Sequence, residues 1–230
     1  MNKNILVIAA HPDDEVLGCG ASIAKWVKNG DEVNVLILAE GITSRDKTRN
    51  LDSRLQELSD LKKSAINASE ILGVKSVHLL SYPDNRMDSV DLLEIVKDIE
   101  THIKKIKPRV VITHHPSDLN IDHQITFQAT LTACRPLPGS LVKRIMCFEI
   151  LSSTEWQVPF SNNVFFPTWY ENITNTFSSK INALKCYQDE LNKWPHPRSF
   201  EAVESLAKRR GSSVGVNMAE AFALVREIKA

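Results

Sequence analysis

The chain has 230 residues, 43% hydrophobic and 24% charged, which is typical of a soluble globular protein that buries a core without disulfide or metal staples. Its 28 basic and 28 acidic residues cancel, and this argues against nucleic acid as a partner, because phosphate binding favours a basic excess. The four cysteines show no CxxC spacing, and no stretch is long and apolar enough for a bilayer span or a signal-peptide core. We therefore expect a reduced, cytoplasmic protein.

Short apolar runs alternate with amphipathic segments in the first two thirds of the chain. The apolar runs predict buried strands at residues 4–10, 33–39, 76–81, 109–113 and 145–150. Apolar residues three and four apart predict helices between them, at residues 15–29, 53–72, 90–106 and about 123–134. This order indicates βαβ units and an α/β fold: a Rossmann-like, mostly parallel sheet with helices on both faces.

The last third, about residues 151–230, is predicted to be a C-terminal extension packed on the core of about residues 1–150. No repeat or clear linker separates the two parts, so we expect a single domain over residues 1–230. The aromatic, proline-bounded residues 158–169 favour an irregular hairpin. Helical spacing predicts further helices at residues 177–191, 200–208 and 218–228.

Ligand-capable side chains follow the first predicted strand. His11 is expected where this strand ends, at the edge of the sheet. Asp14 lies three residues later, so both side chains can face one point at the start of a helix. An imidazole nitrogen and a carboxylate oxygen suit zinc or another borderline cation. Asp13 then lies beside the metal without binding it and can accept a proton from water. The alternative is structural, because paired aspartates at a helix start also cap it and complement its dipole.

A second polar loop, residues 114–123, follows the fourth predicted strand. Both loops fall beyond the carboxyl ends of parallel strands, so they meet at one edge of the sheet. We select His123 as the third ligand, and three protein ligands leave open the position that a catalytic zinc needs. Asp122 is predicted either to orient a neighbouring group from behind the metal site or to act as a first-turn helix acid.

The two loops, AHPDDE at residues 10–15 and SDLNIDH at residues 117–123, resemble the LmbE/PIG-L family of zinc-dependent N-deacetylases. The resemblance implies a Rossmann-like fold, zinc at His11, Asp14 and His123, and Asp13 as general base. It also implies removal of an acetyl group from an N-acetylated sugar. Iron(II) suits the same ligands as zinc.

One residue departs from the family pattern. Many relatives carry a histidine three residues before the last ligand, where this chain has Asn120. Asparagine can donate a hydrogen bond to an oxyanion but cannot supply a proton near neutral pH. The proton for the leaving amine is then expected from Asp13 or from His115, and Asp13 is favoured because it needs no new geometry.

Substrate contacts are predicted after the second and third strands. Asp84 and Arg86 are candidates for holding sugar hydroxyls or a phosphate, and a polar turn is the alternative interpretation. Arg45 lies in a polar stretch that forms either a lid or an ordinary surface loop.

Two other functions remain open at this point. The first is an amidase that acts on a larger N-acyl group or a thiol conjugate, since the metal loops do not specify the acyl chain. The second is a non-catalytic, Rossmann-like nucleotide-binding protein, suggested by the glycines at residues 18–20. The full GxGxxG pattern is absent, and two aspartates precede the helix where a pyrophosphate would have to bind.

Overall fold

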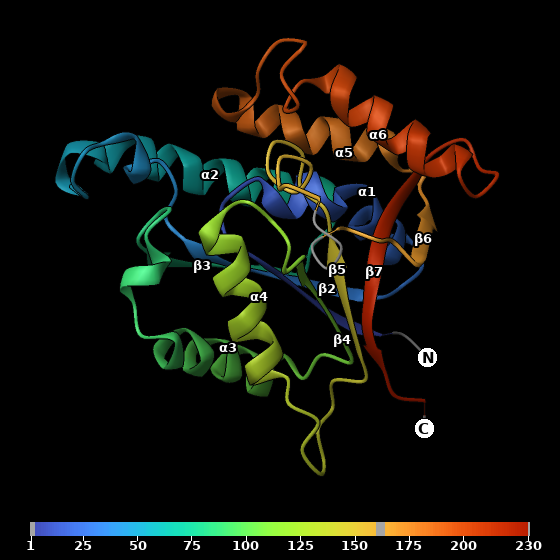
Figure 1. The fold of residues 1–230 in the computed structure, drawn as a ribbon, viewed down its shortest axis with the longest axis horizontal. Helices are drawn as coiled ribbons and strands as arrows, with labels where there is room; N and C mark the ends of the chain where they lie inside the picture. The colour runs from blue at the N-terminus through green and yellow to red at the C-terminus, as the bar shows by residue number, and fades with distance from the viewer. Residues whose placement is uncertain (1–2, 160–163, 230) are drawn as a thin grey trace.

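A seven-stranded sheet lies at the centre of the computed structural model, which describes residues 3–159 and 164–229 (Figure 1). The strand order is β3-β2-β1-β4-β5-β7-β6, with the first five strands parallel and β7 antiparallel to β5 and β6. The strands are β1 (Asn4–Ala9), β2 (Glu32–Ala39), β3 (Ser76–Tyr82), β4 (Val110–His114), β5 (Arg144–Phe148), β6 (Trp169–Asn172) and β7 (Ala219–Glu227). The order of the first five confirms the predicted Rossmann-like class.

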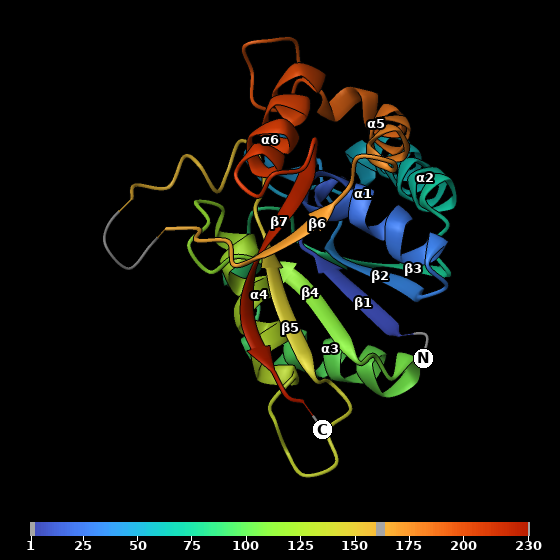
Figure 2. The same ribbon diagram turned by 90° about the vertical axis from the view of Figure 1, so that its right-hand side faces the viewer.

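Helices cover both faces of the sheet (Figures 1 and 2). One face carries α1 (Asp14–Lys28), α2 (Leu55–Leu72), α5 (Phe177–Leu184) and α6 (Phe200–Ser212). The other carries α3 (Leu92–Ile106) and α4 (Ile121–Ala133). Short 3₁₀ helices lie in the connections: η1 (Thr43–Arg45), η2 (Asp52–Arg54), η3 (Met87–Ser89) and η4 (Lys185–Glu190). Within the described ranges, none of these helices has both the length and the apolar character needed to cross a membrane.

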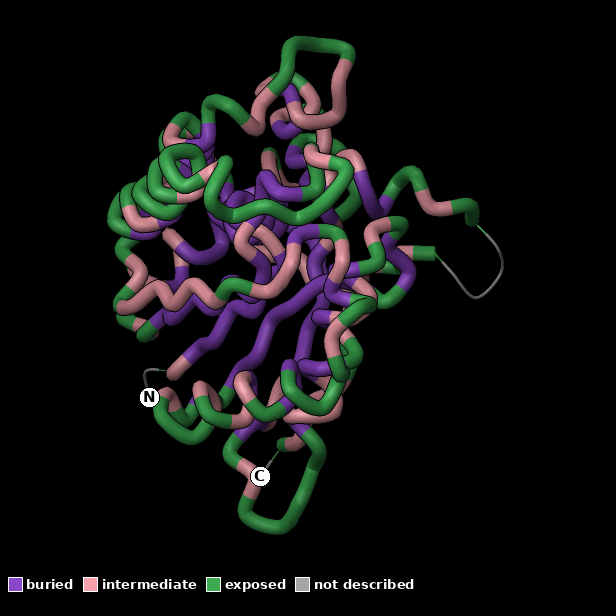
Figure 3. Tube along the Cα trace, turned by 90° about the vertical axis from the view of Figure 1, so that its left-hand side faces the viewer, coloured by how far each residue is buried: buried purple, intermediate pink, exposed green. Residues whose placement is uncertain are grey.

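The central strands are buried on both sides, as their apolar runs predict. In β1, Ile5 and Val7 pack toward α1 and α2, whereas Leu6 and Ile8 pack toward α3 and α4. Figure 3 shows the buried strands as a layer between helices whose outer surfaces are exposed. Because helices cover both faces of the central strands, the polar loops lie beyond the carboxyl ends of these strands.

The largest difference between the C-terminal extension and the sequence prediction is its last element. Residues 218–228 were expected to form a helix, but residues 219–227 form β7, which lies between β5 and β6. Long-range pairing to two strands outweighs the helical propensity of this alanine-rich segment. The helix expected at residues 177–191 is α5 followed by η4.

The predicted hairpin at residues 158–169 includes residues 160–163, which lie outside the described residues. Residues 164–168 have no regular structure, and β6 begins at Trp169. One sheet runs through both the core and the extension. A single domain over residues 1–230 stays our prediction.

Helix α1 is broken in its middle, and a buried ion pair fills the break. Cys19 has φ −150° and ψ 22°, which interrupts the helical hydrogen bonds on either side. Glu220 accepts hydrogen bonds from the backbone N–H groups of residues 21–22, at 3.2 and 2.7 Å. Lys180 donates to the carbonyl oxygen of Leu17 at 2.7 Å and to Glu220 at 2.6 Å. The pair therefore satisfies backbone groups that the break exposes inside the core.

We expect Glu220→Ala to lower the free energy of unfolding by about 3–5 kcal/mol, because it leaves Lys180 as a buried charge without its partner. The measurement is denaturant unfolding followed by circular dichroism. The control is Glu204→Ala, which removes an exposed i,i+4 pair with Lys208 and is expected to cost less than about 1 kcal/mol. Equal losses in the two variants would contradict a role for the pair in holding α1.

Candidate metal centre

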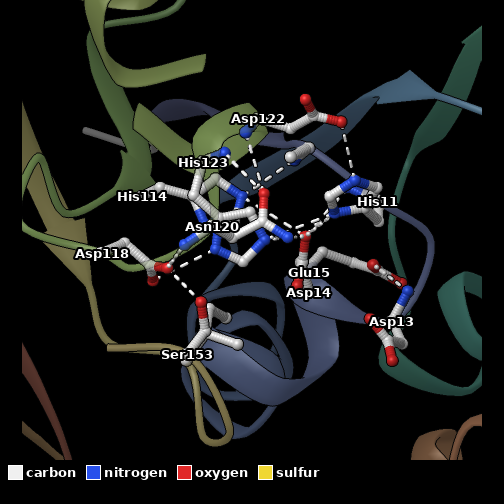
Figure 4. Close-up of polar contacts among 12 residues, drawn as sticks. His11, Asp13, Asp14, Glu15, His114, Asp118, Asn120, Asp122, His123 and Ser153 are labelled. Atoms are coloured by element: carbon white, nitrogen blue, oxygen red, sulfur yellow. Dashed lines mark hydrogen bonds and ion pairs between the residues drawn. The ribbon is translucent and has the colours of Figure 1, made fainter. Parts of the chain in front are cut away.

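Side chains from two distant loops meet at the carboxyl ends of β1 and β4. His11 lies just after β1, Asp14 is the first residue of α1, and His123 lies in the first turn of α4. Figure 4 shows the two imidazoles on either side of the Asp14 carboxylate. Because β1 and β4 are hydrogen-bonded neighbours, residues more than 100 positions apart are brought together here.

The three side chains form a triangle of ligand atoms that fits a tetrahedral metal ion. His11 Nδ1 lies 3.3 Å from His123 Nε2 and 3.3 Å from Asp14 Oδ2, and the third side, from His123 Nε2 to Asp14 Oδ2, is 3.2 Å. Tetrahedral bonds of about 2.0–2.1 Å place ligand atoms about 3.3 Å apart. The other Asp14 oxygen, Oδ1, is buried without a hydrogen-bond partner among the described residues. The residues present therefore fit a metal ion with an open fourth position.

Each histidine of the triangle faces a carboxylate with its second ring nitrogen. His11 Nε2 lies 3.1 Å from Asp122 Oδ2, and His123 Nδ1 lies 3.1 Å from Asp118 Oδ2. Asp122 also accepts hydrogen bonds from the backbone N–H groups of Asn85 and Met87, at 2.6 and 2.9 Å. Carboxylates in this position orient metal-binding histidines and raise their basicity.

Asp118 is itself held in place from the loop after β5. It accepts hydrogen bonds from the hydroxyls of Ser153 and Thr154, the latter at 2.8 Å, and from the backbone N–H of Asn120 at 2.9 Å. Burial alone would raise its pKa, but His123 and these donors hold the pKa of Asp118 at about 2. It therefore faces His123 as a carboxylate at neutral pH.

The pKa values in the triangle indicate a site that attracts positive charge. Burial would raise the pKa of Asp14, but the imidazole of His123 and hydrogen bonds from His11 and His123 hold it well below its usual value. Burial would lower the pKa of His123, yet Asp14 and Asp118 raise it to about 9. The pKa of His11 is raised in the same way, by hydrogen bonds to Asp122 and Asp14. The carboxylates therefore favour positive charge at these imidazoles, and a metal ion that binds there competes with protons.

Asp13 lies beside the triangle and does not join it (Figure 4). Its φ of 103° is unusual for a residue with a side chain, and such strain is common at functional sites. Its Oδ2 accepts a hydrogen bond from Arg198 at 2.8 Å, whereas its Oδ1 has no partner within the described part of the chain. Burial raises the pKa of Asp13 well above its usual value, and Arg198 opposes this effect.

Asn120 caps helix α4 with its side-chain oxygen. Its Oδ1 accepts hydrogen bonds from the backbone N–H groups of Asp122 at 2.8 Å and His123 at 3.4 Å. Since the cap requires an acceptor, the orientation of the amide is fixed, and its Nδ2 donates to Asn85 Oδ1 at 2.7 Å. Both Asn120 and Asn85 line the adjacent cavity, so this hydrogen bond lies at its wall.

A cavity of about 110 Å³ opens beside Asp13 and His11, and several of the residues selected from sequence line it. Asp84 lies in its wall, with Oδ1 3.3 Å from His11 Nε2 and Oδ2 accepting the backbone N–H of Ser44. Arg45 also lines it and pairs with Glu190 at 2.8 Å. A second cavity of about 420 Å³ shares Arg45 and Glu190 as walls, so the two hollows adjoin.

Two of the selected residues lie away from this cavity. Arg86 donates to the carbonyl oxygens of Asp46 and Lys47, at 2.9 and 3.3 Å. The His115 ring packs edge-on against Phe165, with the ring centroids 5.1 Å apart, and its Nδ1 accepts the backbone N–H of Ser117. Neither contributes to the cavity wall.

Several residues that contact the centre were not predicted from the sequence. His114 Nε2 accepts the backbone N–H of Ala10 at 2.8 Å, and its ring stacks on His123. Asp118 was detectable in principle, because a carboxylate in the same loop as a ligand is a common partner for a histidine. Arg198 was not detectable from the sequence, because it lies 185 residues from Asp13 in a segment with no metal-binding pattern.

Two sequence comparisons point to the same family of proteins. The profile of the PIG-L family, described as GlcNAc-PI de-N-acetylase, matches residues 6–134, more than half of the chain. The Escherichia coli (strain K12) protein named uncharacterized deacetylase YaiS is 30% identical over 189 residues, which cover 80% of this chain and 89% of that protein. The two polar loops, residues 10–15 and 114–123, both fall inside the region that the profile matches.

Two solved structures share the fold at low sequence identity. The N,N'-diacetylchitobiose deacetylase from Pyrococcus horikoshii has a TM-score of 0.77 at 20% identity, covering 97% of this chain and 84% of that one. GalB, the 4-carboxy-2-hydroxymuconate hydratase from Pseudomonas putida KT2440, has a TM-score of 0.76 at 20% identity, with 99% and 98% covered. Proteins named for different reactions share this fold, so the fold alone does not identify the reaction.

The triangle predicts that purified protein holds about one divalent ion per chain and that Asp14→Ala loses it, because one of three ligands is removed. Asp118→Asn should keep all three ligands and weaken metal binding by roughly 10–100-fold. Metal content after dialysis, measured by elemental analysis, checks both. The control is the exposed Asp52→Ala, which should retain metal fully. Wild-type protein that takes up no metal on reconstitution would contradict the site.

Proposed function

The chain belongs to the PIG-L family of de-N-acetylases, and on this premise we propose that it is a metal-dependent hydrolase that removes the acetyl group from an N-acetylated sugar or sugar conjugate. The single observation that carries the proposal is the triangle of His11, Asp14 and His123 with the free oxygen of Asp13 beside it. The name of the family profile and that of the Pyrococcus protein both specify N-acetylated sugars. The proposed partner is therefore a small-molecule sugar substrate.

We propose zinc as the metal, with iron(II) as the alternative. Two imidazole nitrogens and one carboxylate oxygen are ligands that suit either ion. When bound there, the metal supplies a Lewis acid that polarises an amide carbonyl and makes water more acidic. The four cysteines are all free thiols, which fits the reducing cytoplasm that we propose as the location.

Asp13 is proposed as the group that moves the proton. Its Oδ1 has no hydrogen-bond partner among the described residues and can accept the proton of the water that attacks the amide carbon. Burial raises the pKa of Asp13, and a carboxyl group that has accepted a proton can deliver it to the leaving nitrogen. His115 packs against Phe165 outside the cavity, which favours Asp13 over His115 for the second transfer.

Asn120 is proposed to stabilise the oxygen of the amide as charge develops on it. The cap fixes the amide so that Nδ2, the donor, is the end on the cavity side. A donor held in advance costs no reorganisation during the reaction. Asp122 is proposed to orient His11, to which it is hydrogen-bonded, and so to act through the metal site and not on the substrate.

The substrate side of the cavity is proposed to include Asp84 and Arg45. The buried Asp84 carboxylate and the Arg45 guanidinium offer an acceptor and donors to sugar hydroxyls. The adjoining larger cavity gives room for more of a sugar conjugate than the acetamide group alone. Arg86 remains a weaker candidate, because its guanidinium is already bonded to loop carbonyls.

A nucleotide-binding function is not favoured. In a dinucleotide fold the glycines lie in the turn between the first strand and its helix, where backbone N–H groups contact the phosphates. Here residues 18–20 lie inside α1, and an added Cβ at Gly18 would lie 2.5 Å from the Phe148 ring. This glycine thus permits close packing of α1 on β5. The turn itself carries Asp13 and Asp14, which repel an anion.

A panel of N-acyl sugars tests the proposed reaction. We expect metal-loaded protein to release acetate from N-acetylglucosamine or N,N'-diacetylchitobiose, measured by an enzyme-coupled acetate assay. N-propionyl and N-butanoyl glucosamine should react more slowly, because the cavity beside Asp13 is small. Chelation should abolish release and zinc should restore it. Faster release of the longer acyl groups would favour the amidase alternative, and no release from any N-acetyl sugar would refute the proposal.

Asp13→Ala should lower turnover by about 10²–10⁴-fold with metal content unchanged, because the proton acceptor is lost and the ligands remain. His115→Ala should leave turnover within about tenfold, roughly 1.4 kcal/mol. Steady-state kinetics with parallel metal analysis measure both variants. A thousandfold loss in metal-replete His115→Ala would transfer the second proton step to His115, and near-normal turnover in Asp13→Ala would exclude Asp13 as the base.

A further inference from the structure

An arginine from the C-terminal extension touches the predicted general base. Arg198 Nη1 donates to Asp13 Oδ2 at 2.8 Å, and the Arg198 side chain, 23% exposed, forms part of the cavity wall. Asp13 is almost fully buried. Among the described residues, Arg198 is the one side chain that hydrogen-bonds to this carboxylate.

The surroundings of Asp13 explain why a cation is needed there. Asp13, Asp14 and Glu15 are three consecutive buried carboxyl groups. Asp14 faces histidines, and Glu15 accepts hydrogen bonds from the Tyr187 hydroxyl at 2.7 Å and from the Asp13 backbone N–H at 3.1 Å. Asp13 has no such set of donors apart from Arg198. A buried carboxylate without a partner is strongly disfavoured, and it can also rotate between rotamers.

Three further hydrogen bonds hold Arg198. Its Nε donates to Ser152 Oγ at 2.8 Å, and its backbone N–H donates to His196 Nδ1 at 3.0 Å. Its carbonyl oxygen accepts the backbone N–H of Asn192 at 3.1 Å. Because Nε and Nη1 lie in one rigid plane, bonds to Ser152 and Asp13 together fix the direction of the guanidinium. A lysine carries the charge but cannot make both contacts in one plane.

We propose that Arg198 is a positioning residue that holds Asp13 by Oδ2 and thereby aims the free Oδ1 at the attacking water. This inference rests on the proposed hydrolase function. It makes the C-terminal extension part of the active site, although Arg198 lies outside the residues that the family profile matches. The fixed guanidinium compensates the charge of a carboxylate whose backbone is already strained.

The experiment compares Arg198→Ala with Arg198→Lys and the exposed Arg209→Ala on the N-acetyl sugar that wild-type protein hydrolyses. We expect Arg198→Ala to lower kcat about a hundredfold, as a misplaced reacting group does, with metal content unchanged. KM should change less than about threefold, because Arg198 acts on Asp13 and not on the substrate. Arg198→Lys should fall between wild type and alanine, and Arg209→Ala should match wild type.

Added guanidinium ion gives the decisive readout. At millimolar, non-denaturing concentrations it should restore part of kcat in Arg198→Ala and leave wild type and Arg209→Ala unchanged, because only the alanine variant has space for it. A kcat of Arg198→Ala within twofold of wild type would overturn the inference. The inference would also be overturned if guanidinium restored none of the lost kcat and the Arg198→Ala variant had a lower unfolding midpoint than wild type. Wild-type protein that holds metal but hydrolyses no N-acetyl sugar would instead overturn the proposed function, and the inference with it.

Discussion

The pairing of β1 with β4 sets the geometry of the whole centre. These strands are more than 100 residues apart in the chain, yet Ile5 pairs with Val110 and Val7 with Ile112. Beyond the last ladder pair, the His114 side chain accepts the backbone N–H of Ala10 and so extends the contact to the residue before His11. Burial lowers the pKa of His114 well below its usual value, which keeps the ring neutral and able to accept. A shift of either strand by one residue would separate the two ligand loops.

Concentrated negative charge is the main energetic cost of this arrangement. Buried carboxylates at Asp13, Asp14, Asp118 and Asp122 lie around a few histidines and one arginine. Each would be unfavourable alone, and each is held by backbone N–H groups, hydroxyls, imidazoles or a guanidinium. Between His11, Asp14 and His123, the surrounding carboxylates raise the pKa values of both histidines. The same negative charges therefore favour a cation in this space.

Local patterns in the sequence were sufficient for the core and for the two ligand loops. Continuous apolar runs predict doubly covered strands, and β1, β2 and β4 are indeed buried along their length. The same reasoning was wrong for β7, because a segment rich in alanine and leucine has helical propensity and its strand state depends on distant partners. Arg198 was not predicted for the same physical reason, because a contact between residues 185 positions apart leaves no local pattern in the sequence. The roles of the site residues stay predictions, since geometry constrains chemistry without demonstrating it.

The C-terminal extension does more than widen the sheet. Three of its side chains reach the β1–α1 segment at successive points: Arg198 at Asp13, Tyr187 at Glu15 and Lys180 at Leu17. Glu220 in β7 continues this series by accepting the backbone N–H groups just after the helix break. The segment that carries two of the predicted metal ligands, His11 and Asp14, and the predicted base is thus held along its length by residues outside the matched family profile. Because Asp13 is strained and the helix after it is broken, the shape of this predicted ligand loop depends on contacts from the extension as well as on the β1–β4 pairing.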